Sequence, residues 1–394
     1  MKKTSSPIAH FMRLAVTYLL VVAVLLFGIP ATVIWWHNHG NFSDKTKATL
    51  PANINLSLTD TRWIADGANK TDDKLETLHF NSHLLTFGWL SGAADLSGTY
   101  NKLKVVSPAC TAFSISAPVT FSLDPSRISA WHRAGLKVWG RIAIADQTTA
   151  ATHQFLSNTA LTDADIEKVQ SYVHASGIDG LNIDIENISA ADEQAFITFI
   201  GKLTQAVKSI SPQFVLSIDG QCDSDLSTKQ MASATRALAN IADYIIFMGY
   251  DEHWSTDPVP GPVASLQWVD NGIQRLLQSG MPARKLLLGL PSYTRIWHID
   301  GNGKTVDSRA VSNEYIQAVL QQENIPQRFQ SQEGLYYSTF NYRDQPYEVW
   351  SSDTTGMQNF LKLVEKYHLG GFGFWTMNLL STNQWNALAA AWTP

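Results

Sequence analysis

Short apolar runs alternate with longer amphipathic stretches from residue 83 to the end of the chain. The short runs are rich in β-branched and aromatic residues, which favours strands, and the longer stretches are typical of helices. Eight runs are strand-like: 84–90, 110–116, 136–144, 180–186, 214–219, 244–251, 286–293 and 371–378. Strands that alternate with helices predict a parallel α/β sheet, and eight is the number that closes a (β/α)8 TIM barrel.

The gap between the seventh and eighth runs is about twice as long as most of the others. We therefore predict a small α+β insertion at 294–353, rich in aromatic residues, that forms one wall of a cleft above the barrel. An open, doubly wound sheet is the alternative fold, and it would normally carry a glycine-rich phosphate loop after its first strand. No such loop follows 84–90, so a closed barrel over 83–394 is predicted.

The amino-terminal region has a different pattern. Segment 14–36 is 23 residues long without a charge, which as a helix spans roughly 34 Å and matches a bilayer core. Lys2, Lys3 and Arg13 precede it, so the positive-inside bias places 1–13 in the cytoplasm. We predict a single-pass signal-anchor in the cell membrane, a polar extracytoplasmic linker at 37–82 and a barrel outside the cell. Secretion after cleavage of a signal peptide is the alternative.

Composition narrows the function further. The formal charge of −5 gives no excess of basic residues that would bind nucleic acid, so we expect no nucleic-acid partner. Aromatic residues make up 11% of the chain, and their flat rings can stack against sugars as well as fill a core. The two cysteines, Cys110 and Cys222, lack metal or redox spacing, and their expected positions on nearly opposite strands are too far apart for a disulfide. No metal or cofactor is expected.

The fourth strand-like run, Asp179-Gly-Leu-Asn182-Ile-Asp184-Ile-Glu186, carries the candidate chemistry. Side chains alternate along a strand, so Asn182, Asp184 and Glu186 share one face and the aliphatic residues share the other. In a barrel the polar face points inward, and its burial is tolerated at the carboxyl ends of the strands, where barrel enzymes place their active sites. Asp179, at the other end of the run, is predicted to be structural.

Two other interpretations of this run are less favoured. A calcium loop would need a glycine at its sixth position, where Asn187 follows instead. A solvated edge strand would not carry so continuous an aliphatic face. We favour catalysis by a carboxylic acid whose pKa is raised by a buried carboxylate neighbour.

This run resembles the D-G-x-D-x-D-x-E signature of family 18 glycoside hydrolases, the chitinase-like enzymes. The sixth run agrees, because Met248-Gly-Tyr250-Asp251 is similar to the family's M-x-Y-D. Trp375 falls where the family places a tryptophan under the sugar. The order and spacing agree over about 310 residues, from position 84 to the end.

Segments 250–254 and 261–269, with Glu348-Val-Trp350, look most like spore-cortex-lytic N-acetylglucosaminidases, which act on peptidoglycan. Two positions depart from the chitinase pattern. Asn182 stands where most chitinases have Asp, although the cortex-lytic subgroup and the di-N-acetylchitobiases resemble this chain there. Trp139-Gly-Arg-Ile replaces the S-x-G-G of the third strand.

The resemblance implies retaining hydrolysis of a β-1,4 bond in which the substrate's own acetamide is the nucleophile. Glu186 would be the acid and later the base, Asp184 would orient the acetamide nitrogen, and Tyr250 would donate to its carbonyl oxygen. The residues expected to bind the N-acetylated polysaccharide are Asn182, Met248, Asp251, Trp254 and Trp375. Because Asn182 removes one negative charge, we expect the pKa of Glu186 to be raised less than in a relative with Asp there.

A catalytically inactive, lectin-like barrel is the alternative function, and a structural or regulatory wall-binding protein is a third. Glu186 favours the enzyme, since loss of that acid is the expected mark of an inactive member.

Overall fold

The computed structural model describes residues 75–80, 83–92, 94–220 and 228–393, all of which belong to the compact unit 50–394. The predicted cytoplasmic segment 1–13 and membrane span 14–36 lie outside these residues. Within the described part of the chain, no helix combines the length and apolar character needed to cross a bilayer.

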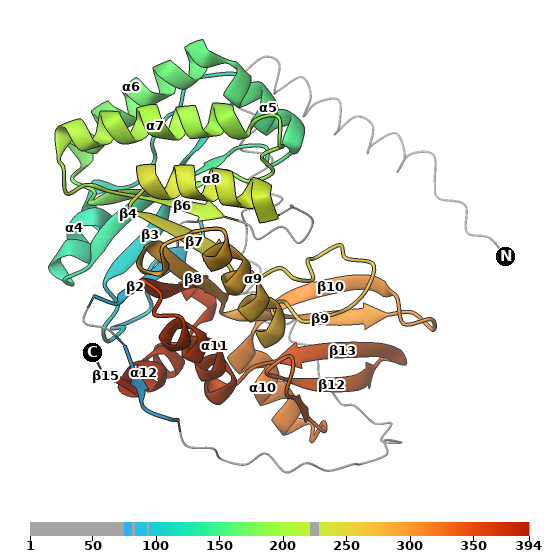
Figure 1. The fold of residues 1–394 in the computed structure, drawn as a ribbon. Coiled ribbons are helices and arrows are strands. Elements are labelled where there is room, and N and C mark those ends of the chain that lie inside the picture. Colours follow the sequence, from blue (N-terminus) through green and yellow to red (C-terminus); the bar gives the residue numbers. More distant parts are fainter. Residues whose placement is uncertain (1–74, 81–82, 93, 221–227, 394) are drawn as a thin grey trace, which may run out of the picture. The chain divides into compact units, whose positions relative to one another are not determined.

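Eight parallel strands close a barrel in the order β14-β2-β3-β4-β5-β6-β7-β8 (Figure 1). Their bounds are β2 (Leu85–Leu90), β3 (Val105–Phe113), β4 (Lys137–Ile144), β5 (Gly180–Asp184), β6 (Val215–Gly220), β7 (Tyr244–Met248), β8 (Leu286–Pro291) and β14 (Gly371–Trp375). Each predicted run overlaps one of these strands, so the predicted TIM barrel is confirmed.

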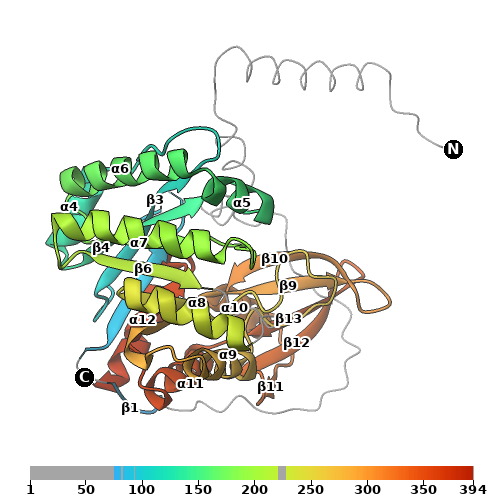
Figure 2. The same cartoon turned by 45° about the horizontal axis from the view of Figure 1, so that its top comes forward.

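Helices cover the outside of the barrel (Figures 1 and 2). They are α4 (Pro125–Arg133), α5 (Thr149–Ser157), α6 (Thr159–Ser176), α7 (Glu193–Ile210), α8 (Thr228–Ile241), α9 (Leu266–Gln278), α11 (Thr354–Lys366) and α12 (Thr382–Ala390). Most begin after a side chain that accepts a backbone N–H of the first turn, which satisfies a donor that the helix itself cannot. These capping residues include Asp124, Thr148, Asn158, Ser265, Asp353 and Ser381.

Two apolar layers hold the barrel together. The inner layer fills the lower interior with Phe87, Trp89, Val105, Trp139, Ile246 and Leu287. The outer layer lies between strands and helices and contains Leu181 and Ile183 of β5 together with Ile185, which directly follows that strand. The two faces of β5 therefore separate as the alternation predicts.

The described amino-terminal residues join the barrel domain. Strand β1 (Leu78–His79) pairs in parallel with β15 (Trp392–Thr393), and Leu78 and Phe80 are buried. These residues fall inside the segment 37–82 that we predicted as a linker, so its last residues are part of the folded domain. The Phe80 ring packs against Phe372 of β14 and against Trp392 near the carboxyl terminus, with 6.0 and 5.9 Å between ring centroids.

The segment between β8 and α11 forms a small α+β module, as predicted. It comprises β9 (Tyr293–Ile299), β10 (Thr305–Ser312), α10 (Asn313–Gln322), β11 (Arg328–Gln330), β12 (Leu335–Tyr342) and β13 (Gln345–Ser351). The strands form an antiparallel sheet in the order β10-β9-β13-β12-β11, at the right of Figure 1. Val311, Ile316, Leu320, Phe340 and Val349 give this insertion a buried core of its own.

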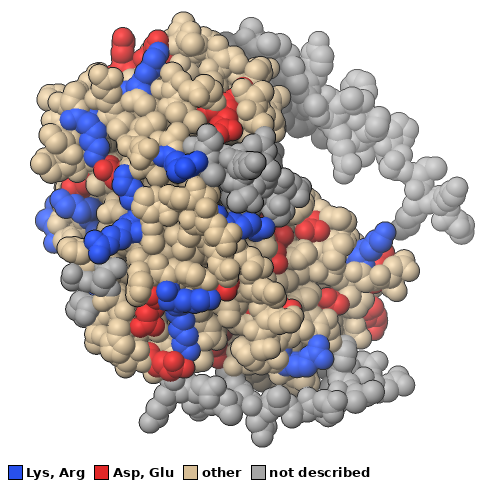
Figure 3. Space-filling model, viewed as in Figure 1, with Lys and Arg blue, Asp and Glu red and all other residues tan. Residues whose placement is uncertain are grey.

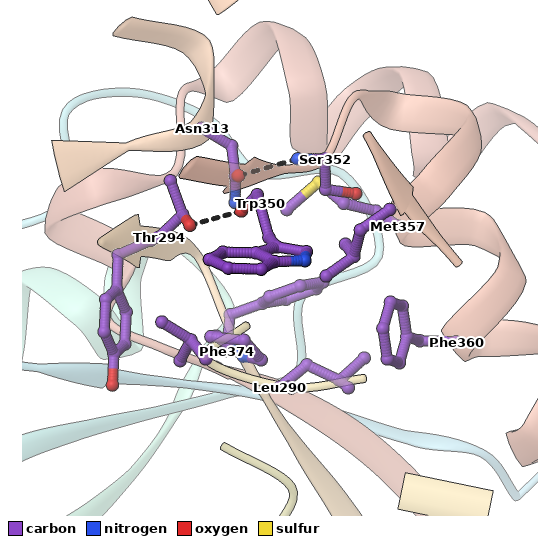
Figure 4. A pocket seen from close by; sticks show the side chains of 13 residues that line it. Leu290, Thr294, Asn313, Trp350, Ser352, Met357, Phe360 and Phe374 are labelled. Atoms are coloured by element: carbon purple, nitrogen blue, oxygen red, sulfur yellow. Dashed lines mark hydrogen bonds between the residues drawn. The ribbon is translucent and has the colours of Figure 1, made fainter. Parts of the chain in front are cut away.

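Figure 4 shows the contact between the insertion and the barrel. Leu290 of β8 and Phe374 of β14 form the barrel side. On the insertion side, Thr294 Oγ1 donates a hydrogen bond to the carbonyl oxygen of Trp350, and the backbone N–H of Ser352 donates to Asn313 Oδ1 at 2.9 Å. The cavity among these side chains has a volume of about 30 Å³, whereas ligand pockets typically measure about 300–1,000 Å³. It is a packing gap and not a sugar site.

Acidic and basic side chains are interspersed on the face shown in Figure 3, without one continuous patch of either sign. Cys110 is buried in β3 with a free thiol, and Cys222 lies outside the described residues.

Candidate active site

The polar face of β5 points into the mouth of the barrel. In the sheet, Asn182 lies level with Arg141 of β4 and Ser217 of β6. Asn182 is completely buried, Asp184 is 6% exposed, and Glu186 follows the end of the strand and is only partly exposed. From Asn182 to Glu186, the three side chains thus lie progressively closer to the carboxyl-end rim of the barrel, where barrel enzymes have their active sites.

The amide of Asn182 is fully engaged by neighbouring strands. Its Oδ1 accepts hydrogen bonds from Trp89 Nε1 at 2.7 Å and Ser107 Oγ at 3.4 Å. Its Nδ2 donates to Asp219 Oδ1 at 2.7 Å and Ser217 Oγ at 3.2 Å. We expected this residue to bind substrate, but in the structure it supports the site from below and presents no free polar atom to a ligand.

Asp184 forms an ion pair with Arg141, with 2.6 Å between Asp184 Oδ2 and Arg141 Nη1. Both side chains are largely buried, at 9% and 14% exposure, so water screens their attraction only weakly. Arg141 was not among the predicted site residues. The only sequence signal was its place in the Trp139-Gly-Arg-Ile segment that departs from the family pattern.

The carboxyl group of Glu186 has a pKa raised to about 8. Burial is the main cause, and the negative charges of Asp184 and Asp251 add to it, while Arg141 opposes the shift. A carboxylic acid that remains protonated at neutral pH can donate a proton to a leaving oxygen. Of the three polar residues of this face, Glu186 is therefore the one suited to general acid catalysis.

Asp219, at the end of β6, is a second acid that sequence reasoning missed. It is buried, and burial together with the charge of Asp184 raises its pKa well above the usual range. Burial likewise raises the pKa of Tyr250, with Asp219 as the next cause. The Tyr250 hydroxyl is therefore a persistent donor. The signal for Asp219 was an acid at the carboxyl end of a predicted barrel strand.

Aromatic rings form the floor of the site. Trp89 contacts Trp375 edge to face, with 5.9 Å between ring centroids, and Tyr250 similarly at 6.2 Å. The guanidinium carbon of Arg141 lies 5.0 Å from the centroid of the Trp375 ring. These contacts connect strands from three parts of the chain, because Trp89 belongs to β2, Arg141 to β4 and Trp375 to β14.

The rim is formed by the residues that follow β7. Asp251 Oδ1 accepts a hydrogen bond from Tyr293 Oη at 2.6 Å, which brings the start of the insertion against the site. Trp254 is 50% exposed, as a sugar-stacking ring would be. Met248 is buried, and it lines a cavity of about 360 Å³ that is bordered mainly by α7, α8 and the outer faces of the strands, and that Glu186 and Asp219 also reach.

Asp179 lies at the opposite end of β5. Its carboxylate accepts hydrogen bonds from Lys137 Nζ and His132 Nε2, both at 2.8 Å, and from the backbone N–H of Val138 at 2.9 Å. Burial opposes its ionisation, but these partners outweigh burial and lower its pKa. It joins α4 and β4 to β5 and takes no part in the site.

No group of three or more His, Cys, Asp or Glu side chains in the described ranges is arranged to hold a metal ion. The site instead combines acids of raised pKa, among them Glu186 and Asp219, with one carboxylate paired with a guanidinium, a protonated tyrosine and an aromatic floor. Two carboxyl groups whose environments differ in this way can act as proton donor and charge stabiliser.

The sequence matches the family described as "Glycosyl hydrolases family 18" over residues 129–379, more than half of the chain. That range includes β5, Tyr250 and Trp375.

Relatives agree with this match. The chain is 26% identical over 241 residues to a protein of Bacillus subtilis (strain 168) named "Putative sporulation-specific glycosylase YdhD". That match covers 59% of this chain and 54% of YdhD, so the chain spans about half the length of this relative.

Solved structures show the same fold. The spore cortex-lytic enzyme SleL of Bacillus cereus superposes with a TM-score of 0.67 at 17% identity, covering 80% of this chain and 75% of SleL. A class V chitinase mutant from Cycas revoluta, in complex with (GlcNAc)3, gives a TM-score of 0.66 at 18% identity and covers 78% of this chain and 99% of that chain.

Proposed function

Because the chain belongs to glycosyl hydrolase family 18, we propose that this glycosidase cleaves β-1,4 bonds after an N-acetylated sugar, in peptidoglycan or a chitin-like polymer. The observation that carries the proposal is the contrast between two neighbouring carboxyl groups. Glu186 has a pKa of about 8, while Asp184 is ion-paired with Arg141. Acid and charge stabiliser are thus provided on one face of one strand.

In the proposed reaction, Glu186 gives its proton to the glycosidic oxygen as the bond from C1 to that oxygen breaks. The carbonyl oxygen of the sugar's acetamide forms a bond to C1 and produces an oxazolinium ion. Asp184 stabilises the positive charge near the acetamide nitrogen, and the Tyr250 hydroxyl donates to the acetamide oxygen.

Water completes the cycle. Glu186, now a carboxylate, accepts a proton from water as the water oxygen attacks C1 and the oxazolinium bond to C1 breaks. The acetamide is restored, and the β configuration is retained because C1 has been inverted twice. The raised pKa suits Glu186 to both steps, since it is a proton donor and an effective base near neutral pH.

Peptidoglycan is the substrate we favour. The sequence segments shared with the cortex-lytic subgroup support it, as does the likeness to a sporulation-specific glycosylase and a spore cortex-lytic enzyme. The fold shared with a chitinase that binds (GlcNAc)3 supports an N-acetylglucosamine polymer more broadly.

We also propose that segment 14–36 anchors the protein in the cell membrane with its barrel outside. The support is the uncharged run and the basic residues before it. Full-length protein should remain in washed membranes, and protease added to intact cells should reach the barrel. Release of a shortened protein, with a new amino terminus after residue 36, would instead establish cleavage and secretion.

The activity test uses full-length protein in detergent with peptidoglycan and with chitin oligomers. We expect new reducing ends from the wild type and none from Glu186→Gln. Glu167→Gln on α6, at an exposed position, is the matched control and should retain activity. Glycan binding without release of reducing ends would contradict the proposal and favour the lectin-like alternative.

A further inference from the structure

Arg141 occupies an unusual position for a barrel arginine. It points inward from the middle of β4, level with the buried Asn182, and its side chain is only 14% exposed. The guanidinium group bridges two predicted site residues, since it pairs with Asp184 at 2.6 Å and lies over the ring of Trp375 at 5.0 Å. A single side chain thereby connects the carboxylate and the floor of the site.

A purely structural role explains this arginine poorly. Burying an ion pair removes two charges from water, and the attraction regained often no more than balances that cost. In addition, the Nε–H of Arg141 is buried and has no hydrogen-bond partner among the described residues.

The charge balance of the site suggests a different role. Beyond burial, which is the main cause in each case, the charges of Asp184 and Asp251 raise the pKa of Glu186, and those of Asp184 and Glu186 raise the pKa of Asp219, because neighbouring negative charges disfavour ionisation of a further acid. Arg295 is the cation that lowers the pKa of Asp251, whereas Arg141 acts on both Glu186 and Asp219 and lowers the pKa of each. Its effect is limited, because both values remain raised.

We propose that Arg141 is a positioning residue that holds the Asp184 carboxylate by its ion pair and is itself held by Trp375. Its positive charge also sets the proton affinity of Glu186, the proposed acid. This inference rests on the proposed function of the same site. Asn182 and Arg141 then act together, because the neutral amide removes a negative charge from β5 and the guanidinium adds a positive one opposite Asp184.

The test compares Arg141→Met, which keeps the length of the side chain but not its charge, with Arg141→Lys, which keeps the charge but not the planar group. Arg127→Met is the matched control, because Arg127 also pairs with an aspartate, Asp95 at 3.8 Å, and lies over a tryptophan, Trp131 at 4.8 Å. Arg127 and Trp131 both belong to α4, on the outside of the barrel.

The readout is the pH profile of kcat/KM. In Arg141→Met we expect the alkaline limb to move up by about one pH unit, because loss of this opposite charge disfavours ionisation of Glu186. We expect kcat to fall about tenfold to a hundredfold, since Asp184 is no longer held in place. Arg141→Lys should keep the alkaline limb near its wild-type position and recover part of kcat, and Arg127→Met should change neither.

An unmoved alkaline limb in a folded Arg141→Met variant would overturn the inference while the proposed function stands, provided that Glu186→Gln is inactive. Activity is not the only readout. The carboxyl carbon of Glu186, assigned by the NMR resonance missing in Glu186→Gln, should titrate at higher pH in Arg141→Met than in wild type. Equal titration midpoints in both proteins would overturn the inference even if no hydrolysis is found.

Discussion

Replacement of Asn182 by Asp is the sharpest probe of the site's electrostatics. In the wild type, Asn182 Nδ2 donates to Asp219 Oδ1 at 2.7 Å. In Asn182→Asp, two carboxyl oxygens face each other at that distance, while the bond from Trp89 Nε1 can still be accepted. The change alters charge with almost no change in volume.

The magnitude follows from the distance. Two unit charges 2.7 Å apart repel by about 6 kcal/mol at an effective dielectric constant near 20, which corresponds to roughly four pKa units. The pair therefore shares one proton across the neutral range and carries one negative charge. Asn182 is neutral, so the variant adds a carboxyl group, and with it negative charge, beside Asp219, whose pKa burial already raises well above its usual range.

The added charge disfavours ionisation of Glu186, so its pKa should rise above about 8. Since Glu186 must be protonated to act as the acid, the alkaline limb of kcat/KM should move to higher pH, by about half a unit to one unit. The assay is release of reducing ends from an N-acetylglucosamine oligomer between pH 5 and pH 10.

Asn386→Asp provides the control. Its amide hydrogen-bonds to the backbone N–H of Asn101 and the carbonyl oxygen of Thr99, and α12 lies outside the barrel. This variant adds the same charge away from β5 and should leave the profile unchanged. An alkaline limb that stays in place in a folded Asn182→Asp protein would refute our account of how Asn182 and Glu186 interact.

Other predictions use the same site and its supports. Wild-type kcat/KM should fall as the pH rises through about 8, the pKa of Glu186; a profile flat to pH 10 would contradict this. The pKa of Glu186 is raised on folding, so the unfolded chain loses this proton at lower pH than the native protein does. The free energy of unfolding therefore falls as the pH rises from about 4.5 to about 8. Glu186→Gln should have a higher Tm than wild type at pH 9 and a similar one near pH 4. Trp89→Phe leaves Asn182 Oδ1 without its 2.7 Å donor and should lower the free energy of unfolding by about 1–3 kcal/mol in denaturant titrations. In Gly180→Ala the new Cβ would lie 2.7 Å from the carbonyl oxygen of Val215, so the same titrations should show a loss of about 1–3 kcal/mol; an unchanged midpoint would show that the strands can separate at no cost.

Local sequence determined a large part of this protein. Alternation along β5 needs only the covalent geometry of an extended strand, so the separation of Asp184 and Glu186 from the aliphatic face could be predicted without any partner strand. The number of apolar runs predicted the barrel, and the long gap at 294–353 predicted the insertion. The roles assigned to Glu186, Asp184 and Tyr250 remain predictions.

Tertiary structure decided which side chains meet. Arg141 faces Asp184 because β4 and β5 pair with Arg141 level with Asn182, and a shift of one residue would turn Arg141 away from the interior. Asp219 and Trp89 reach Asn182 from other strands in the same manner. Sequence patterns describe each strand separately, whereas the register between strands depends on contacts among residues far apart in the chain. The acidic strand could therefore be identified from the sequence. Its contacts with Arg141, Asp219 and Trp89 could be identified only from the three-dimensional structure.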